Sequence, residues 1–206
     1  MAIINQATKE LHLKIVYYGP ALCGKTTNII KIHENVASVQ EKGKLVSLAT
    51  SSDRTLFFDF LPLEALAVKG YRTKFQLYTV PGQVIYNTTR QLVLRGVDGV
   101  VFVADSQYEK MAENVESFAN LEENLAALKL NLGEIPYVLQ YNKRDLPGAA
   151  PVEYIEFLLN NREVQVPAFE VCASTCEGVF ESLNMITRLL LHKLMSEGTR
   201  KAPAYA

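Results

Sequence analysis

The chain alternates between short apolar or alternating runs, which predict β-strands, and longer stretches with helical periodicity. Strands are expected in six runs, at 11–19, 54–63, 71–80, 99–105, 136–145 and 166–174, and the last two continue into loops. Helices are expected at 25–36, 111–130 and 179–195. This order predicts an α/β fold, in which helices cover both faces of a mixed, mostly parallel sheet of about six strands.

Details of the pattern refine the expected topology. The run at 99–105, GVVFVAD, is apolar almost throughout, as expected for a central strand covered on both faces. Only a turn-rich connection separates 54–63 from 71–80, so these strands are expected to pair as a hairpin. The polar stretch 34–54 lacks a strong period and is expected to hold a loop and a short strand. The first ten residues are a candidate for one further edge strand.

Length and composition are those of one ordinary globular domain. The 206 residues are 49% hydrophobic and 21% charged, and we expect a single domain at 1–196 with a flexible tail at 197–206. Twenty-one basic and 22 acidic residues give a net charge of −1, so charge provides no case for binding nucleic acid or an anionic membrane. No apolar run approaches the ~18 residues of a membrane-spanning helix.

The cysteines and the termini predict a cytoplasmic protein without a direct membrane anchor. The three cysteines lack the spacing of a disulfide framework, and the first ten residues lack the basic and apolar regions of a secretion signal. Cys172 and Cys176 have no nearby Cys/His pair to complete a zinc site, which favours packing over metal binding. The end of the chain, RKAPAYA, has no cysteine to prenylate, and Met1-Ala2 is not a myristoylation start.

The segment 19–26, GPALCGKT, matches the P-loop pattern G-x-x-x-x-G-K-[ST] between a predicted strand and a predicted helix. Backbone N–H groups of such a loop surround the β-phosphate, while Lys25 reaches the β- and γ-phosphates and Thr26 ligates Mg²⁺. A chance match rarely falls at a strand–helix junction, so we favour a phosphate-binding loop. The predicted phosphate-binding residues are Gly19, Ala21, Leu22, Cys23, Gly24, Lys25, Thr26 and Thr27.

The segment 142–145, NKRD, directly follows a predicted strand and indicates which base is bound. The Asp145 carboxylate can accept hydrogen bonds from N1–H and the 2-amino group of guanine, and adenine offers neither donor. Asn142 is expected to brace the loop, and Lys143 to stack its aliphatic stem on the base. A charged turn without a ligand is the alternative for this tetrapeptide alone, but the P-loop earlier in the chain favours guanine recognition.

A weaker third element, CAS, follows the next predicted strand. A backbone N–H near Ala173 is expected to meet the guanine carbonyl, which places Cys172, Ala173 and Ser174 in the predicted nucleotide site. The Cys172 side chain by itself is expected to belong to the core.

In this order, GPALCGKT, TVPGQ at 79–83 and NKRD resemble the motifs of small Ras-like GTPases, which carry D-x-x-G-Q at the second position. Five longer strings resemble the bacterial mutual-gliding GTPases of the MglA type: KIVYYGP, DRTLFFDFLPL, LYTVPGQ, LRGVDGVVFVADS and QYNKRDLP. The resemblance covers about residues 1 to 195.

What the resemblance implies is a three-layer Ras-like P-loop domain that hydrolyses GTP to GDP with Mg²⁺. It further implies a cytoplasmic switch that marks a cell pole and governs motility through polarity and motility effectors. Its regulator would be a dimeric Roadblock-fold activator of the MglB type, which stimulates hydrolysis.

The resemblance also assigns roles in hydrolysis, which needs charge stabilisation and an oriented water. Gln83 is the candidate for orienting the water, and the Gly82 N–H for contacting the γ-phosphate. Thr55 is assigned to Mg²⁺ and γ-phosphate sensing, and Arg54 to an arginine finger supplied in cis. Neighbouring side chains of an extended segment point in opposite directions, so we hypothesise that 38–60 shifts between nucleotide states and that the activator helps to aim Arg54.

Two residues depart from the Ras pattern. Thr79 stands where the metal-organising aspartate is usual, and its hydroxyl can hold a metal-bound water only more weakly than a carboxylate. Ala21 replaces a glycine, and its methyl group is expected to crowd the γ-phosphate and the space that Gln83 must enter. Thr79 is therefore expected to weaken Mg²⁺ retention. Nucleotide binding should survive the methyl group of Ala21, and hydrolysis should be slow without an activator.

Three functions remain open from the sequence. A GTP-dependent switch, which transmits its state through 38–60 and 79–95, is favoured by Gln83, Arg54 and Thr55. A GTP-binding scaffold with little hydrolysis is favoured by Ala21 and Thr79. An ATP-dependent P-loop enzyme is disfavoured by NKRD and by the absence of lid or kinase elements.

Overall fold

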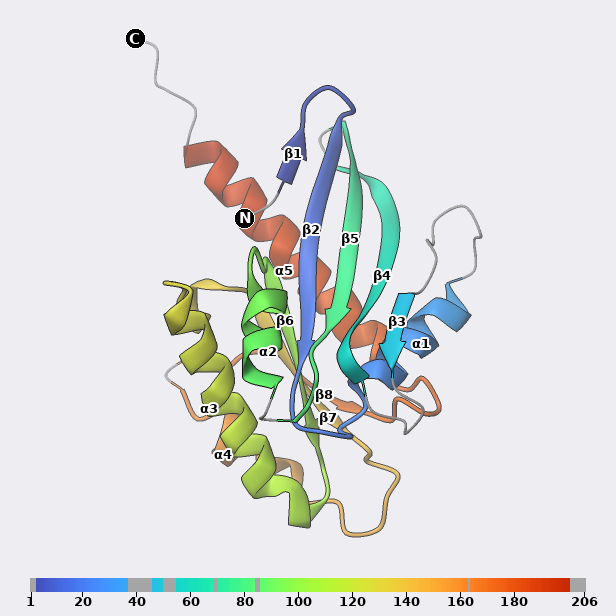
Figure 1. The fold of residues 1–206 in the computed structure, drawn as a ribbon, viewed down its shortest axis with the longest axis vertical. Helices are drawn as coiled ribbons and strands as arrows, with labels where there is room; N and C mark the ends of the chain where they lie inside the picture. The colour runs from blue at the N-terminus through green and yellow to red at the C-terminus, as the bar shows by residue number, and fades with distance from the viewer. Residues whose placement is uncertain are drawn as a thin grey trace.

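A computed structural model describes residues 3–36, 46–49, 55–68, 70–83, 86–162 and 164–200. In this part of the chain, eight strands form one sheet in the order β3-β4-β5-β2-β6-β7-β8, and β1 pairs with β2 beside this path (Figure 1). The strands are β1 (Ile3–Asn5), β2 (Glu10–Tyr18), β3 (Val46–Ala49), β4 (Thr55–Val68), β5 (Tyr71–Thr79), β6 (Gly99–Asp105), β7 (Tyr137–Asn142) and β8 (Ala168–Val171). The helices are α1 (Lys25–Asn35), α2 (Asn87–Leu94), α3 (Met111–Ala127), α4 (Val152–Leu159) and α5 (Val179–Arg200).

The sheet is mixed and mostly parallel, which confirms the predicted fold class. Strands β5, β2, β6, β7 and β8 are parallel, whereas β3, β4 and β5 pair antiparallel. The predicted hairpin is present, with Leu61 of β4 opposite Leu77 of β5. Strand β3 is the short strand expected within 34–54.

The expected N-terminal strand is also present, and the register explains its place. Strand β6 meets β2 only from Ile15 onward, where Ile15 pairs with Gly99. The earlier residues of β2 therefore have an edge free on that side. Strand β1 pairs antiparallel with this part of β2, with Ile4 opposite Leu11.

Two apolar clusters, one on each face of the sheet, make the core. Alternate residues of β2 and β6 supply them, because successive side chains of a strand point to opposite faces. Val16 and Phe102 pack on the side of α2, α3 and α4, and Ile15 and Val103 pack on the side of α1 and α5. All seven residues of β6 are buried, as expected for a strand covered on both faces.

Helices α2 and α4 were not predicted as helices. Each has eight residues, too short to show several turns of apolar periodicity. Two other elements are longer than the runs that predicted them, since β4 continues to Val68 and α5 to Arg200.

The topology collects the candidate chemistry at one edge. The carboxyl ends of parallel strands meet at the same edge of a sheet, where open α/β sheets bind their ligands. The loops after β2, β5, β7 and β8 carry the segments 19–24, 80–83, 142–145 and 172–174 to this edge.

Candidate functional site

The loop between β2 and α1 curls tightly at the carboxyl edge of the sheet. Gly19, Leu22 and Gly24 have φ of 146°, 61° and 101°. Gly24 is required for space as well, because a β-carbon there would lie 2.1 Å from Nδ2 of Asn142. The left-handed conformations let the chain turn sharply before the N-terminus of α1, where an anion is favoured.

Lys25 opens α1 and folds back across this loop. Its side chain is buried, and its Nζ donates to the carbonyl oxygens of Gly19 at 3.0 Å and Pro20 at 2.5 Å. The ammonium group is therefore held at the centre of the loop. Cys23 is fully buried nearby, and burial raises the pKa of its thiol, so the cysteine adds no negative charge beside the lysine. Thr26 follows Lys25 and is partly exposed.

One buried amide joins three loops. Asn142, at the end of β7, is 2% exposed. Its Nδ2 donates to the carbonyl of Cys23 at 2.7 Å, and its Oδ1 accepts the Ala173 N–H at 2.9 Å. The loops after β2, β7 and β8 are thus fixed relative to one another by a single side chain.

A cavity of about 230 Å³ lies beside this amide. It brings together the three segments that carry the sequence motifs, 19–27, 142–146 and 173–174. Its lining residues are Leu22, Gly24, Thr27, Asn142, Lys143, Asp145, Leu146, Ala173 and Ser174. Asp145 is exposed at the cavity, whereas Cys172 is buried behind it with its sulfur 3.1 Å from the Ser174 hydroxyl oxygen.

Asp105 lies at the candidate site, although it was not predicted from the sequence. It ends β6, is 1% exposed, and lies with Oδ2 at 2.5 Å from Nζ of Lys143. Its other carboxylate oxygen accepts the N–H of Gln107. The ion pair holds Lys143, whose backbone has a φ of 68°, over the cavity. The signal in the sequence was a lone acidic residue at the end of an apolar run.

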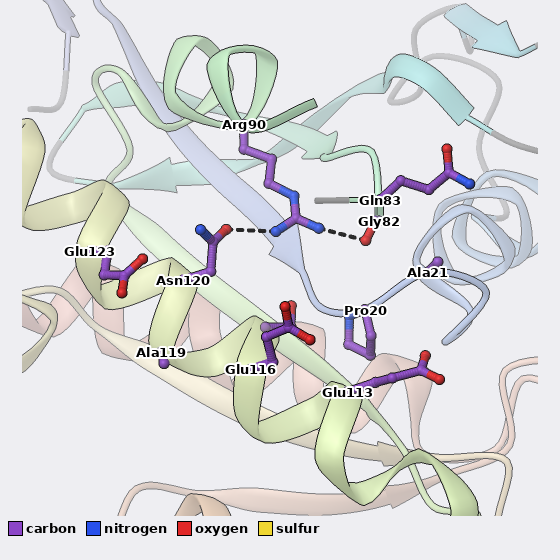
Figure 2. A pocket seen from close by; sticks show the side chains of 11 residues that line it. Pro20, Ala21, Gly82, Gln83, Arg90, Glu113, Glu116, Ala119, Asn120 and Glu123 are labelled. Carbon is purple, nitrogen blue, oxygen red and sulfur yellow. Dashed lines mark hydrogen bonds between the residues drawn. The ribbon is translucent and has the colours of Figure 1, made fainter. Parts of the chain in front are cut away.

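A second, larger cavity of about 580 Å³ lies between the loop 19–24, residues 82–83 and α3 (Figure 2). We call the loop 19–24 the phosphate loop. Ala21 and Gln83 both line it, and Figure 2 shows the Gln83 side chain directed away from Arg90. Carboxylates of α3 line the opposite wall. They are Glu113, Glu116 and Glu123.

Gly82 lies directly against the phosphate loop. A β-carbon at Gly82 would stand 2.4 Å from Cα and 2.6 Å from N of Ala21, so no other residue fits without a shift of the backbone. Thr79, three residues earlier, is fully buried and pairs with Tyr17 of β2, just before the phosphate loop begins. The ends of β5 and β2 thus lie side by side, and the loops that follow them meet at Gly82 and Ala21.

Two predicted site residues cannot be placed in full. Arg54 lies outside the described residues, as do 38–45 and 50–53 of the segment 38–60 that is expected to shift with nucleotide state. Thr55 is the first residue of β4, and the structure describes its backbone alone.

The amino-acid sequence matches one family of known proteins over most of its length. The profile of the Ras family matches residues 14–192. The chain belongs to the Ras family. It is 53% identical to the mutual gliding-motility protein MglA of Myxococcus xanthus, over 96% of this chain and 100% of that protein. It is also 26% identical to the Ras-related protein Rab-13 of Canis lupus familiaris, over 92% of this chain and 87% of that protein.

This Ras-family protein is therefore a GTP-binding small GTPase and a homologue of MglA, which confirms the resemblance drawn from the motifs. Among the described residues, no helix is both long and apolar enough to cross a membrane.

Proposed function

We propose that this Ras-family GTPase is a cytoplasmic switch for cell polarity and gliding motility, active with GTP bound and concentrated at a cell pole. The observation that carries the proposal is the 53% identity to MglA over the full length of that protein. Effectors of polarity and motility would bind its GTP-bound state, and residues 38–60 and 79–95 would transmit the change.

The base would occupy the smaller cavity. Asp145, exposed there, would accept hydrogen bonds from guanine N1–H and the 2-amino group, and the stem of Lys143 would lie along the base. The Ala173 N–H is donated to Asn142, so we place the guanine carbonyl at the neighbouring N–H of Ser174. The phosphates would extend into the loop 19–26, where Lys25 exchanges its carbonyl partners for phosphate oxygens.

Hydrolysis would take place beside the larger cavity. Gln83 would orient the attacking water, and the Gly82 N–H would contact the γ-phosphate, because both lie at the wall formed by Ala21. Arg54 would supply positive charge to the transition state, an assignment that rests on the family resemblance. An arginine finger typically contributes a factor of about 10³–10⁵ in rate.

The residues present fit Mg²⁺ as a partner of the phosphates. No group of three or more His, Cys, Asp or Glu side chains that could hold a metal occurs in the part of the chain that the structure describes. Protein hydroxyls, waters and phosphate oxygens are ligands that Mg²⁺ accepts. Thr26 and Thr55 would supply hydroxyl ligands, and Thr79 would hold a metal-bound water. Bound Mg²⁺ would neutralise charge on the β- and γ-phosphates.

A dimeric Roadblock-fold protein of the MglB type would be the activator and would help to aim Arg54.

The second candidate function is a GTP-binding scaffold, which the methyl group of Ala21 beside Gly82 favours. GTP turnover, measured alone and with a Roadblock protein from the same genome, separates the two. The switch predicts slow turnover that the partner accelerates at least about tenfold, toward the range of arginine fingers. Turnover that the partner leaves unchanged would favour the scaffold.

A further inference from the structure

Arg90 of α2 places a buried guanidinium against the backbone that precedes Gln83. The side chain is 1% exposed. Its Nε donates to the Pro81 carbonyl at 2.9 Å, and its Nη2 to the Gly82 carbonyl at 2.5 Å. Figure 2 shows the guanidinium between Gly82 on one side and Asn120 on the other. Two consecutive carbonyls are thus held by one rigid, planar group.

A polar network holds the guanidinium from its far side. Nη1 donates to Oδ1 of Asn120 at 2.6 Å, and that oxygen also accepts the Tyr18 hydroxyl at 2.7 Å. Asn124, 1% exposed, donates to the Tyr18 hydroxyl oxygen and to Oδ1 of Asn87. The network joins β2, α2 and α3, so Arg90 has little freedom to move. Burial raises the pKa of Tyr18, and its hydroxyl keeps the proton that it donates.

Among the residues that the structure describes, no acidic partner neutralises the charge of Arg90. In the part of the chain that the structure describes, no carboxylate forms an ion pair with it. Carbonyl dipoles and the Tyr18 ring, whose centroid is 5.4 Å from Cζ, stabilise it instead. Burying a cation costs free energy, and a neutral side chain would fill this position at a lower cost. The cost is therefore justified only if the three N–H donors of Arg90 have a function.

The orientation of the two peptide planes indicates this function. The Pro81 carbonyl and the Gly82 N–H belong to one planar peptide, and the Gly82 carbonyl and the Gln83 N–H belong to the next. The peptides are trans, so a carbonyl fixed toward Arg90 turns its N–H to the opposite side. We propose that Arg90 is a positioning residue for GTP hydrolysis, which fixes these two peptides so that Gly82 faces the phosphate loop and Gln83 starts from a fixed point.

This proposal rests on the proposed roles of Gly82 and Gln83. Arg90→Lys is the sharp variant, because lysine keeps the charge but cannot hold two carbonyls and Asn120 in one plane. The experiment measures single-turnover GTP hydrolysis, GDP affinity and melting temperature of the full chain with Mg²⁺. We expect hydrolysis to fall roughly 10- to 100-fold, as for a misplaced catalytic group, with GDP affinity within about threefold of the wild type.

Gln91→Ala is the matched control. Gln91 lies on the same helix and donates to Oδ1 of Asn124 in the same network. Within the described part of the chain, its side chain forms no hydrogen bond with residues 81–83. Its variant should hydrolyse GTP at the wild-type rate.

The double variant Arg90→Lys/Gln83→Ala tests whether Arg90 affects hydrolysis through Gln83. If Arg90 acts through Gln83, the double variant should hydrolyse GTP within about twofold of Gln83→Ala alone.

If Gln83→Ala hydrolyses GTP slowly, any of three results would contradict the role of Arg90. The first is a wild-type rate of hydrolysis in folded Arg90→Lys. The second is a rate loss in the double variant equal to the product of the two single losses, and the third is a loss of GDP affinity as large as the loss of rate. Wild-type hydrolysis by Gln83→Ala would instead overturn the proposed role of Gln83, and that of Arg90 with it. Should Arg90→Lys fail to fold, Asn120→Ala removes the Nη1 acceptor without altering the charge. The same slower hydrolysis at unchanged GDP affinity is then expected, and wild-type hydrolysis would refute the proposal.

Discussion

Gly82 lies so close to Ala21 that a β-carbon at residue 82 would stand 2.4 Å from the Ala21 α-carbon. The loop that carries Gln83 therefore rests on the phosphate loop through bare backbone. The two loops can lie this close only because residue 82 has no side chain. Adding a side chain at this position tests whether the close contact matters for hydrolysis.

Gly82→Ala should push residues 82–83 away from the phosphate loop and displace Gln83. Since a shift of about 1 Å can reduce a rate roughly 100-fold, we expect a loss of that order in single-turnover hydrolysis with GDP affinity nearly unchanged. Gly133→Ala is the control, because its β-carbon would meet only Asn131 Oδ1 at 3.4 Å. Equal rates for both variants would show that the contact has no part in hydrolysis.

Ala21→Gly removes a methyl group from the wall that Gln83 shares. We expect faster hydrolysis, by about tenfold, which corresponds to about 1.4 kcal/mol in the barrier. GDP affinity should stay the same, since in the proposed site the backbone of the loop would provide the phosphate contacts. Single-turnover hydrolysis checks this, and an unchanged rate would rule out crowding by the methyl group.

Asp145→Asn should weaken guanine nucleotides and favour xanthine nucleotides. An amide can no longer accept both guanine donors, and two hydrogen bonds to a charged group together account for at least roughly 100-fold in affinity. Competition between GDP and xanthosine diphosphate for a fluorescent nucleotide measures the exchange. Glu153→Gln, which removes an exposed carboxylate of α4, should leave both affinities unchanged. Undiminished GDP affinity in Asp145→Asn would contradict guanine recognition by this residue.

Asp105→Asn should release Lys143 from its place over the base cavity. The Lys143 ammonium can reach solvent while the amide stays buried, so we expect the free energy of unfolding to fall by about 1–2 kcal/mol. GDP affinity should fall as well. Chemical denaturation and nucleotide titration measure the two effects. Glu34→Gln breaks the exposed pair with Lys31 and should change neither quantity. An unchanged GDP affinity in Asp105→Asn would show that the ion pair does not prepare the site.

Much of the fold could be predicted because its signals are local. Val100 and Phe102 sit in a run that is apolar at nearly every position, and Leu61 and Leu77 lie in strands joined by a short connection. The gathering of 19–26 and 142–145 at one edge follows from the parallel order of the strands that precede them.

The Arg90 network could not be predicted, because it is built from distant residues. Tyr18 and Asn124 are 106 positions apart, and no spacing rule in the sequence links them. Helix α2, which carries Arg90, is too short to be recognised by periodicity. Polar residues on α3 appear in the sequence as an ordinary solvent face, and only the packing of α2 on α3 turns Asn120 and Asn124 inward.

The hydrogen bonds of Asn142 have a consequence for ligand selection. The amide donates to the Cys23 carbonyl of the phosphate loop and accepts the Ala173 N–H beside the smaller cavity. In the proposed site, the two loops that would hold the base and the phosphates therefore could not move independently. A base that displaced its loop would also displace the phosphate-binding loop, so a poor fit at one end of the nucleotide would weaken binding at the other.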